Sequence, residues 1–191
     1  MIYARLGIAM RNREFSYGVL CGAVLTLAGI AIAHGNPENE SDAVQPLIVV
    51  PGSVPRYSGQ QGREADITEL LATSAQTGGK LGIFRQTIAP GSGPPTHLHQ
   101  MEIEFVYVVS GQFKFKVDDR VVSVPVGTLI FVPPNTAHTF KNIGTNPGVL
   151  LFGVTPGGFE KMFAERQGVD ADTNKRLMEK YHMQVVGPPL P

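Results

Sequence analysis

The sequence predicts an all-β domain, folded as a sandwich or barrel of short strands and followed by a short helical tail. Apolar residues make up 42% of the 191 residues, which is enough to bury the core of a single domain. The apolar segments are short, and turns rich in glycine, proline and asparagine separate most of them, as in all-β folds. Residues 113–117 alternate apolar and polar side chains, which predicts a strand with one buried and one exposed face.

The first 33 residues have the pattern of an export signal. A head with three arginines precedes an uncharged run over residues 17–33, which ends in the small-x-small sequence AIA of a signal-peptidase site. We therefore expect residues 1–33 to be a signal peptide that directs the protein to the periplasm or the extracellular space. The alternative is an uncleaved N-terminal membrane anchor over the same residues, since the run is only slightly short for a spanning helix.

A linker is expected after this segment. Residues 34–46 are polar and contain proline, glycine and asparagine. The single cysteine, Cys21, lies in the uncharged run, so the chain after residue 33 has no thiol, which is compatible with export.

The charges of the sequence balance, with 16 basic and 16 acidic residues and a formal net charge of zero. The charged residues are scattered along the chain, so no basic patch suited to nucleic acid is evident. We expect a small molecule, rather than a nucleic acid, as the ligand, and we keep a homodimer as a candidate assembly.

The β domain is expected over residues 44–155. One hairpin is clear, because Asp118 and Asp119 form a turn between residues 113–117 and the next apolar segment. The apolar segments that we expect within this domain cover residues 47–50, 67–72, 81–88, 105–109, 113–117, 121–124, 128–132, 139–143 and 149–154.

The tail, residues 156–191, has helical spacing instead. In the sequence GGFEKMFAERQG, the side chains of Phe159, Met162 and Phe163 fall on one face of a helix. A second helix is expected in DTNKRLMEKYHM, with Asp172 or Thr173 as its N-cap.

Two histidines and a glutamate stand close together in PPTHLHQMEIEFVYVVSG. His97 and His99 point to the same side of a strand, because side chains two residues apart share a face. Glu104 breaks this parity, so a bend or bulge is expected between His99 and Glu104; Glu102 competes for the same role. Histidines that alternate on a strand are more often exposed residues than ligands, so this pair alone does not establish a metal site.

A second segment, VGTLIFVPPNTAHTFKN, strengthens the case for a metal. It reads as a strand, a tight turn at Pro133–Asn135 and a returning strand that carries His138. Three imidazoles and one carboxylate suit one divalent transition metal, namely Fe, Mn, Ni, Cu or Zn, and leave positions open for a substrate. His182, in the tail, has no comparable partner and is expected at the surface.

These two segments resemble the two motifs of the cupin superfamily. The first family motif is G-x5-H-x-H-x(3,4)-E-x6-G, and the second is G-x5-P-x-G-x2-H-x3-N. Asn135 replaces the second glycine of the second motif, and we expect a left-handed backbone there, which asparagine tolerates. The matching positions are Gly91, His97, His99, Glu104, Gly111, Gly127, Pro133, His138 and Asn142. The flanks and the short spacer of residues 112–126 resemble small bacterial cupins that are likened to quercetin dioxygenases.

The resemblance implies a double-stranded β-helix, that is a jelly-roll barrel, with one metal ion inside. It implies that His97, His99, Glu104 and His138 are the metal ligands, and that Glu104 is also the catalytic base that accepts a substrate proton. Phe140 shares the parity of His138 and is expected to face the same cavity. On the strand before the first motif, either Arg85 or Gln86 is expected to orient a substrate.

The family resemblance leaves the function open, because one fold carries many activities. The first hypothesis is a metal-dependent dioxygenase, an oxidoreductase that acts on a small phenolic or enolisable compound. The alternatives are a non-catalytic cupin that binds or senses a small ligand, and a metal-dependent isomerase or decarboxylase.

Overall fold

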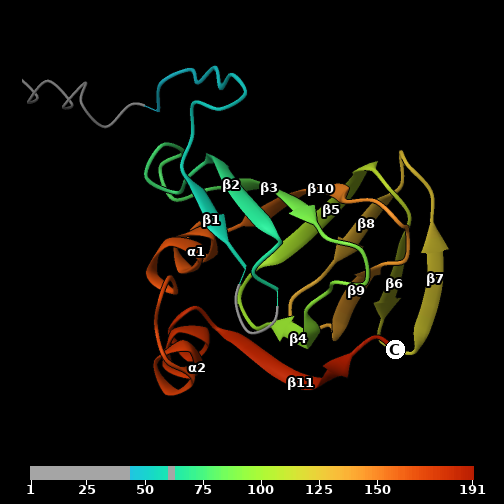
Figure 1. The fold of residues 1–191 in the computed structure, drawn as a ribbon. Coiled ribbons are helices and arrows are strands. Elements are labelled where there is room, and N and C mark those ends of the chain that lie inside the picture. The colour runs from blue at the N-terminus through green and yellow to red at the C-terminus, as the bar shows by residue number, and fades with distance from the viewer. Residues whose placement is uncertain (1–43, 60–62) are drawn as a thin grey trace, which may run out of the picture. The chain divides into compact units, whose positions relative to one another are not determined.

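The computed structural model describes residues 44–59 and 63–191 (Figure 1). The expected signal peptide or anchor and most of the expected linker lie outside the described residues. Among the residues that are described, no helix has both the length and the apolar character needed to cross a membrane.

The described strands form one six-stranded and one five-stranded antiparallel sheet. The six-stranded sheet has the order β1 (Arg56–Ser58), β2 (Ile67–Ala72), β3 (Gly82–Ile88), β10 (Gly148–Thr155), β5 (Ile103–Ser110) and β8 (Leu129–Val132). The five-stranded sheet has the order β11 (Met183–Pro189), β4 (Pro95–His99), β9 (His138–Asn142), β6 (Phe113–Val117) and β7 (Arg120–Val124). The all-β fold class with a helical tail is confirmed, although within the described part the strands remain two separate sheets rather than one closed barrel.

The strands follow the alternation of the sequence closely. β2 and β6 cover the expected residues 67–72 and 113–117. β6 and β7 pair through a two-residue turn, in which Asp118 adopts a positive φ of 50° that matches a tight hairpin. Asn135 has a φ of 62°, which confirms the left-handed backbone expected where the family motif has glycine.

Two local predictions need correction, and one apolar segment, residues 47–50, forms no strand. The N-cap of α2 (Ala171–Lys180) is Asp170, not Asp172 or Thr173, because the Asp170 side chain accepts a hydrogen bond from the backbone N–H of Thr173. The tail also holds more than helices: after η2 (Phe159–Lys161), α1 (Met162–Glu165) and α2, the chain forms β11, which pairs with β4.

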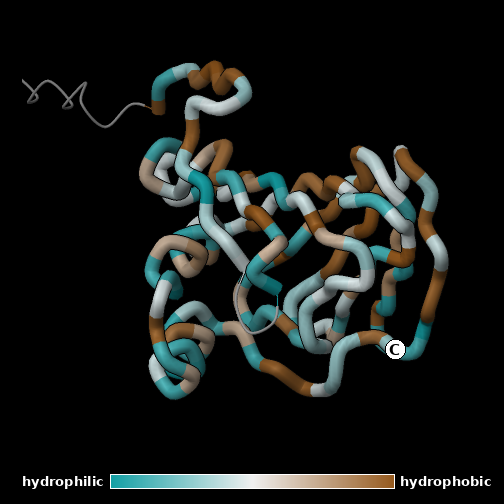
Figure 2. Tube along the Cα trace, viewed as in Figure 1, coloured by the Kyte–Doolittle hydropathy of each residue, from teal (hydrophilic) through white to brown (hydrophobic). Residues whose placement is uncertain are grey.

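The core consists of apolar side chains from both sheets and from the start of the tail. Phe84 and Phe152, on neighbouring strands, stack with ring centroids 4.9 Å apart, and Phe163 of α1 packs on Phe84 at the same distance. Figure 2 shows hydrophobic and hydrophilic residues alternating along several strands. The first tail helix is therefore part of the core, and its residues lie beside the site described below.

Candidate metal centre

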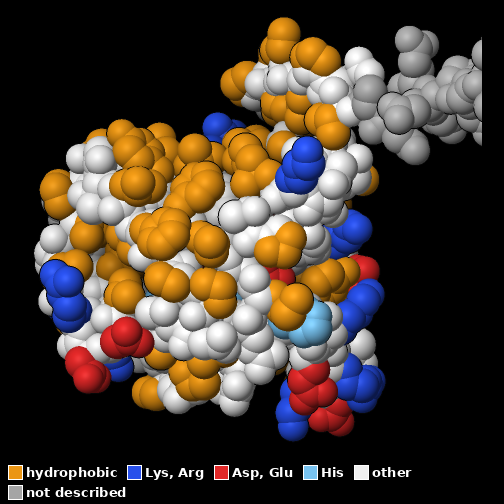
Figure 3. Space-filling model, turned by 180° about the vertical axis from the view of Figure 1, so that it is seen from behind, with side chains coloured by type: hydrophobic (Ala, Val, Ile, Leu, Met, Phe, Trp, Pro, Cys, Tyr) orange, Lys and Arg blue, Asp and Glu red, His pale blue; other side chains and the backbone are white. Residues whose placement is uncertain are grey.

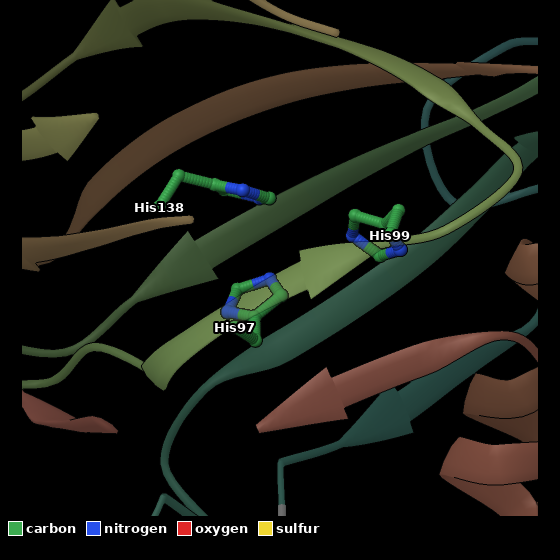
Figure 4. A group of neighbouring side chains, drawn as sticks. All are labelled: His97, His99 and His138. Carbon is green, nitrogen blue, oxygen red and sulfur yellow. The ribbon is translucent and has the colours of Figure 1, made fainter. Parts of the chain in front are cut away.

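Three histidines meet on the inner face of the five-stranded sheet (Figure 4). His97 and His99 lie two residues apart on β4, and His138 lies on β9, directly opposite His97 in the register of the two strands. One nitrogen from each of the three rings lies within 4.8 Å of the other two, and all three residues are buried. The pairing of β4 with β9 thus brings His138 next to the two histidines that share one face of β4, and the three imidazoles form a compact cluster that can hold a metal ion.

Two of the three rings are fixed by the backbone. Nδ1 of His97 lies 2.8 Å from the carbonyl oxygen of Pro95, and Nδ1 of His138 lies 2.9 Å from that of Thr136. Because a carbonyl only accepts, each Nδ1 carries the proton and donates it, which leaves Nε2 as the coordinating nitrogen. Metal-binding histidines are commonly oriented in this way by a backbone carbonyl.

His99 has no such partner. Neither of its ring nitrogens forms a hydrogen bond with any described residue, although the side chain is 2% exposed. Its ring packs edge-on against Phe159, with centroids 4.4 Å apart. A buried polar atom without a partner is energetically costly. A metal ion would accept the lone pair of one ring nitrogen of His99 and so remove this cost.

Glu104 reaches the cluster from the opposite sheet. The chain turns between β4 and β5, so the expected break in parity is a change of sheet rather than a bulge within one strand. Oε2 of Glu104 lies 2.8 Å from Nε2 of His138, and both side chains are almost fully buried. The carboxylate therefore lies against the same histidine nitrogen that would coordinate a metal.

The surroundings of the cluster favour the neutral form of two histidines, His97 and His99, and the ionised form of Glu104. Burial, followed by the neighbouring His138 and His99, lowers the pKa of His97 to about 3. Burial also lowers the pKa of His99. Burial opposes ionisation of Glu104, but its hydrogen bond to His138 and the charges of the histidines outweigh burial and lower its pKa to about 2. His138 is the exception: burial disfavours its charged form, yet Glu104 raises its pKa overall.

The cluster lines a cavity of about 50 Å³ between the sheets. The inward residues include Phe140, as expected, and Gln86, whose Nε2 donates to Thr68 Oγ1 at 3.0 Å. Arg85 does not line it and instead donates to Glu69 at 2.6 and 2.8 Å, which decides the alternative between Arg85 and Gln86.

Other candidates lie elsewhere. Glu102 is buried but does not line the cavity; it borders a separate hollow together with His182 and Tyr181. His182 is exposed, as expected.

The sequence pattern did not place six further residues at the cavity. Arg63 precedes β2, and the apolar residues of the tail and Arg166 follow the β domain. The helical face of the tail was recognised as apolar, but nothing in its spacing indicates that it covers the metal cavity. The residues concerned are Arg63, Phe159, Met162, Phe163, Arg166 and Met183.

A comparison with protein families matches residues 84–154 to the cupin domain model. Residues 84–154 therefore resemble a cupin domain. The matched residues run from β3 to β10 and contain all three histidines and Glu104. The match and the structural neighbours below support a place in the cupin superfamily, and the narrower likeness to quercetin dioxygenases stays a prediction.

Two curated relatives are similar to part of this chain. Uncharacterized protein MJ1618 of Methanocaldococcus jannaschii is 28% identical over 114 residues, which cover 60% of the present chain and 82% of the relative. An oxalate-binding protein of Thermotoga maritima is 25% identical over 96 residues, covering 50% of this chain and 78% of the relative.

Solved structures share the fold at low sequence identity. The polyketide cyclase RemF from Streptomyces resistomycificus has a TM-score of 0.51 and 19% identity, and the match covers 59% of this chain and 80% of RemF. A predicted oxalate decarboxylase of Thermotoga maritima has a TM-score of 0.50 and 22% identity, over 57% of this chain and 98% of that one. These similarities concern the cupin fold alone.

Proposed function

We propose that this cupin is a metal-dependent enzyme, and specifically a dioxygenase that acts on a small enolisable or phenolic compound. The observation that carries the proposal is the convergence of three imidazoles from one sheet and an ionised carboxylate from the other on a single cavity. A fold needs no such cluster for its stability, because burying these groups without a partner is unfavourable. An open coordination position is typical of catalytic rather than structural metal sites.

The ligand set in this proposal is His97, His99, His138 and Glu104, and the metal is Fe, Mn, Ni, Cu or Zn. Bound there, a divalent metal supplies Lewis acidity that lowers the pKa of a coordinated hydroxyl or enol group. Two observations support this set. The ring nitrogens of His99 have no hydrogen-bond partner, and the contact of His97 Nδ1 with the Pro95 carbonyl leaves Nε2 of His97 as the coordinating nitrogen. The lowered pKa of His97 means that no proton has to be displaced from it near neutral pH.

Glu104 is the proposed proton acceptor. It is ionised at neutral pH, and among the residues that line the cavity it is the only carboxylate. A substrate hydroxyl or acidic C–H that reaches the cavity would transfer its proton to a Glu104 oxygen. Dioxygen is the co-substrate, and both of its oxygen atoms end in the products. Phe140, Phe152 and Phe159 line the cavity and make part of its wall apolar.

A second candidate function is the binding of a small acid without turnover. The relative of Thermotoga maritima that bears the name oxalate-binding protein supports it, as does the size of the cavity, which has room for only a few water-sized groups. The two functions differ in whether substrate and oxygen disappear.

The test begins with protein that lacks residues 1–33. Metal analysis should find about one transition-metal ion per chain, and an oxygen electrode should detect oxygen uptake with one or more enolisable acids, catechols or flavonols. Glu104→Gln should keep much of the metal on its three histidines, while turnover falls roughly a hundredfold or more, as for loss of a general base. Metal-loaded protein that consumes neither oxygen nor substrate across this set would favour the binding function and contradict the enzyme.

A further inference from the structure

Two arginines line the metal cavity, and both lie outside the residues that match the cupin domain. Arg63 lies before β2, and Arg166 lies immediately after α1 in the tail. Neither belongs to the motifs that hold the histidines. They therefore reach the metal cavity from segments on either side of the matched residues.

Arg63 is held by a buried carboxylate. Its Nε lies 2.8 Å from Oδ2 of Asp66, and the same carboxylate accepts hydrogen bonds from Ser92 Oγ at 2.7 Å and from the backbone N–H of Ala89 at 2.8 Å. Asp66 is 3% exposed, so this anchor is rigid. The charge of Arg63 is thus balanced by Asp66, and its position at the cavity is fixed.

Arg166 has no comparable partner. Its Nε is buried and forms no hydrogen bond with any described residue, and no ion pair of Arg166 is present in residues 44–59 and 63–191. Arg63 and Arg166 line the same cavity, and burial, followed by the charge of Arg63, lowers the pKa of Arg166. A partly buried cation beside a second cation is unfavourable unless an anion binds between or beside them.

The tail holds Arg166 in place. Its backbone N–H donates to the Met162 carbonyl at 3.0 Å, and the preceding residue, Glu165, accepts hydrogen bonds from Lys180 and Tyr181, each at 2.6 Å. These contacts join α1 to the end of α2. The backbone at Arg166 is therefore braced on both sides, as expected for a residue that must present its side chain to a ligand.

We infer that the ligand of this cavity is a small carboxylate, and that Arg166, assisted by Arg63, is the residue that selects for its negative charge. This inference deepens the proposed function and rests on it for the metal. The planar guanidinium matches a carboxylate in a two-bond contact, which an ammonium or an amide cannot reproduce. With a cavity of about 50 Å³, the class is a short acid with a neighbouring oxygen, such as a 2-oxo acid, rather than a three-ring flavonol.

The experiment compares pyruvate with its neutral amide, pyruvamide, which keeps the 2-oxo group and one carbonyl oxygen, has an NH2 group in place of the second carboxylate oxygen, and lacks the charge. Binding is measured by titration calorimetry on metal-loaded protein without residues 1–33, so the readout does not depend on turnover. Wild-type protein should bind pyruvate roughly ten- to a hundredfold more tightly than pyruvamide, the range expected for a hydrogen-bonded ion pair. Arg166→Gln and Arg166→Met should remove most of this preference while metal content stays at the wild-type level.

Arg176→Gln is the matched control, because Arg176 is an exposed arginine of the same tail, and it should leave the preference unchanged. Arg166→Lys, which keeps the charge but not the planar fork, should retain an intermediate preference and guards against misfolding of the other two variants. Equal binding of acid and amide by wild-type protein, or a preference that survives in both Arg166→Gln and Arg166→Met, would overturn the inference. If the protein preferred pyruvate to pyruvamide but turned over no substrate, the inference about Arg166 would hold and only the dioxygenase proposal would be contradicted.

Discussion

Glu104 Oε2 and His138 Nε2 lie 2.8 Å apart across the space between the two sheets. Each residue comes from a strand of a different sheet, and the contact moves their pKa values in opposite directions, down for Glu104 and up for His138. In the absence of a metal, this pair shares the proton that a metal ion would have to displace. The contact therefore links the charge of the site to its readiness to bind metal.

Removal of one histidine should remove the metal. His99→Ala should lower the metal content of the purified protein well below one ion per chain, because it removes one of the four ligand side chains and leaves its coordination position unfilled. Inductively coupled plasma mass spectrometry provides the measurement, and circular dichroism checks the fold. His182→Ala, which changes an exposed histidine, is the control and should keep its metal. Full occupancy in the His99 variant would contradict the assigned ligands.

Metal-free protein should lose stability in acid. The unfolded chain takes up a proton on His97 near pH 6.5, whereas the folded chain does so only near 3, so the free energy of unfolding falls as the pH drops below 6.5. One such proton contributes up to about 1.4 kcal/mol per pH unit. Glu104, with its pKa lowered from 4.5 to about 2, adds a loss below pH 4.5. His138 acts on the other side: its raised pKa stabilises the fold at pH 6.5 and below, and this contribution is lost as the pH rises through that pKa.

Urea unfolding in the presence of a chelator, at several pH values between 4.5 and 8, measures this dependence. His97→Gln should make the slope between pH 6.5 and 4.5 shallower, with the contribution of His99 remaining, while His182→Gln should leave the slope as in the wild type. The same slope in His97→Gln and in wild-type protein would show that another group causes the acid sensitivity.

The outer face of β5 and β8 predicts a homodimer. Four large apolar side chains are exposed there, and Tyr107 pairs directly with Leu129 in the register of the two strands. Their exposed fractions are 40% for Tyr107, 44% for Val109, 61% for Leu129 and 59% for Phe131. Figure 3 shows hydrophobic side chains gathered on one face of the molecule, and an apolar patch of this kind is typical of a protein interface.

Light scattering coupled to size-exclusion chromatography tests this assembly. Wild-type protein should have twice the mass of the chain, and Phe131→Glu should halve it. Ile48→Glu changes an apolar residue that is 92% exposed and lies outside the patch, and it should leave the dimer intact. A wild-type protein that is already monomeric at micromolar concentration would refute the prediction.

Export remains a prediction from the N-terminal pattern. N-terminal sequencing of the protein from its native host, after fractionation of the cells, should begin at His34 if residues 1–33 are a cleaved signal peptide. An intact chain in the membrane fraction would instead support the anchor. An intact chain in the soluble cytoplasm would contradict both.

The sequence alone predicted the fold class and the four residues that meet at the cavity, because strand parity and motif spacing are local properties. It did not predict β1 or β11, whose short or proline-containing sequences lack alternation and whose pairing depends on distant strands. Nor did it bring Arg63 and Arg166 together, since most of the β domain lies between them in the sequence and no motif fixes their spacing. The sequence also could not tell whether Gln86 or Arg85 faces the cavity. That depends on the hydrogen bonds of Gln86 to Thr68 and of Arg85 to Glu69, which form only in the folded sheet.

The last strand, β11, covers the outer edge of β4 at the two histidines: Met183 pairs with His99, and Val185 pairs with His97. The boundaries suggested by family similarity therefore do not mark a fragment that can be expressed by itself. A chain trimmed to residues 84–154 would leave the backbone of β4 open to pairing with other molecules, and it would lose Arg166 in the same cut. If related genes recombined at the tail, two properties would change together. The exchanged tail would replace both β11, which pairs with the histidine-bearing strand β4, and Arg166, which lines the cavity.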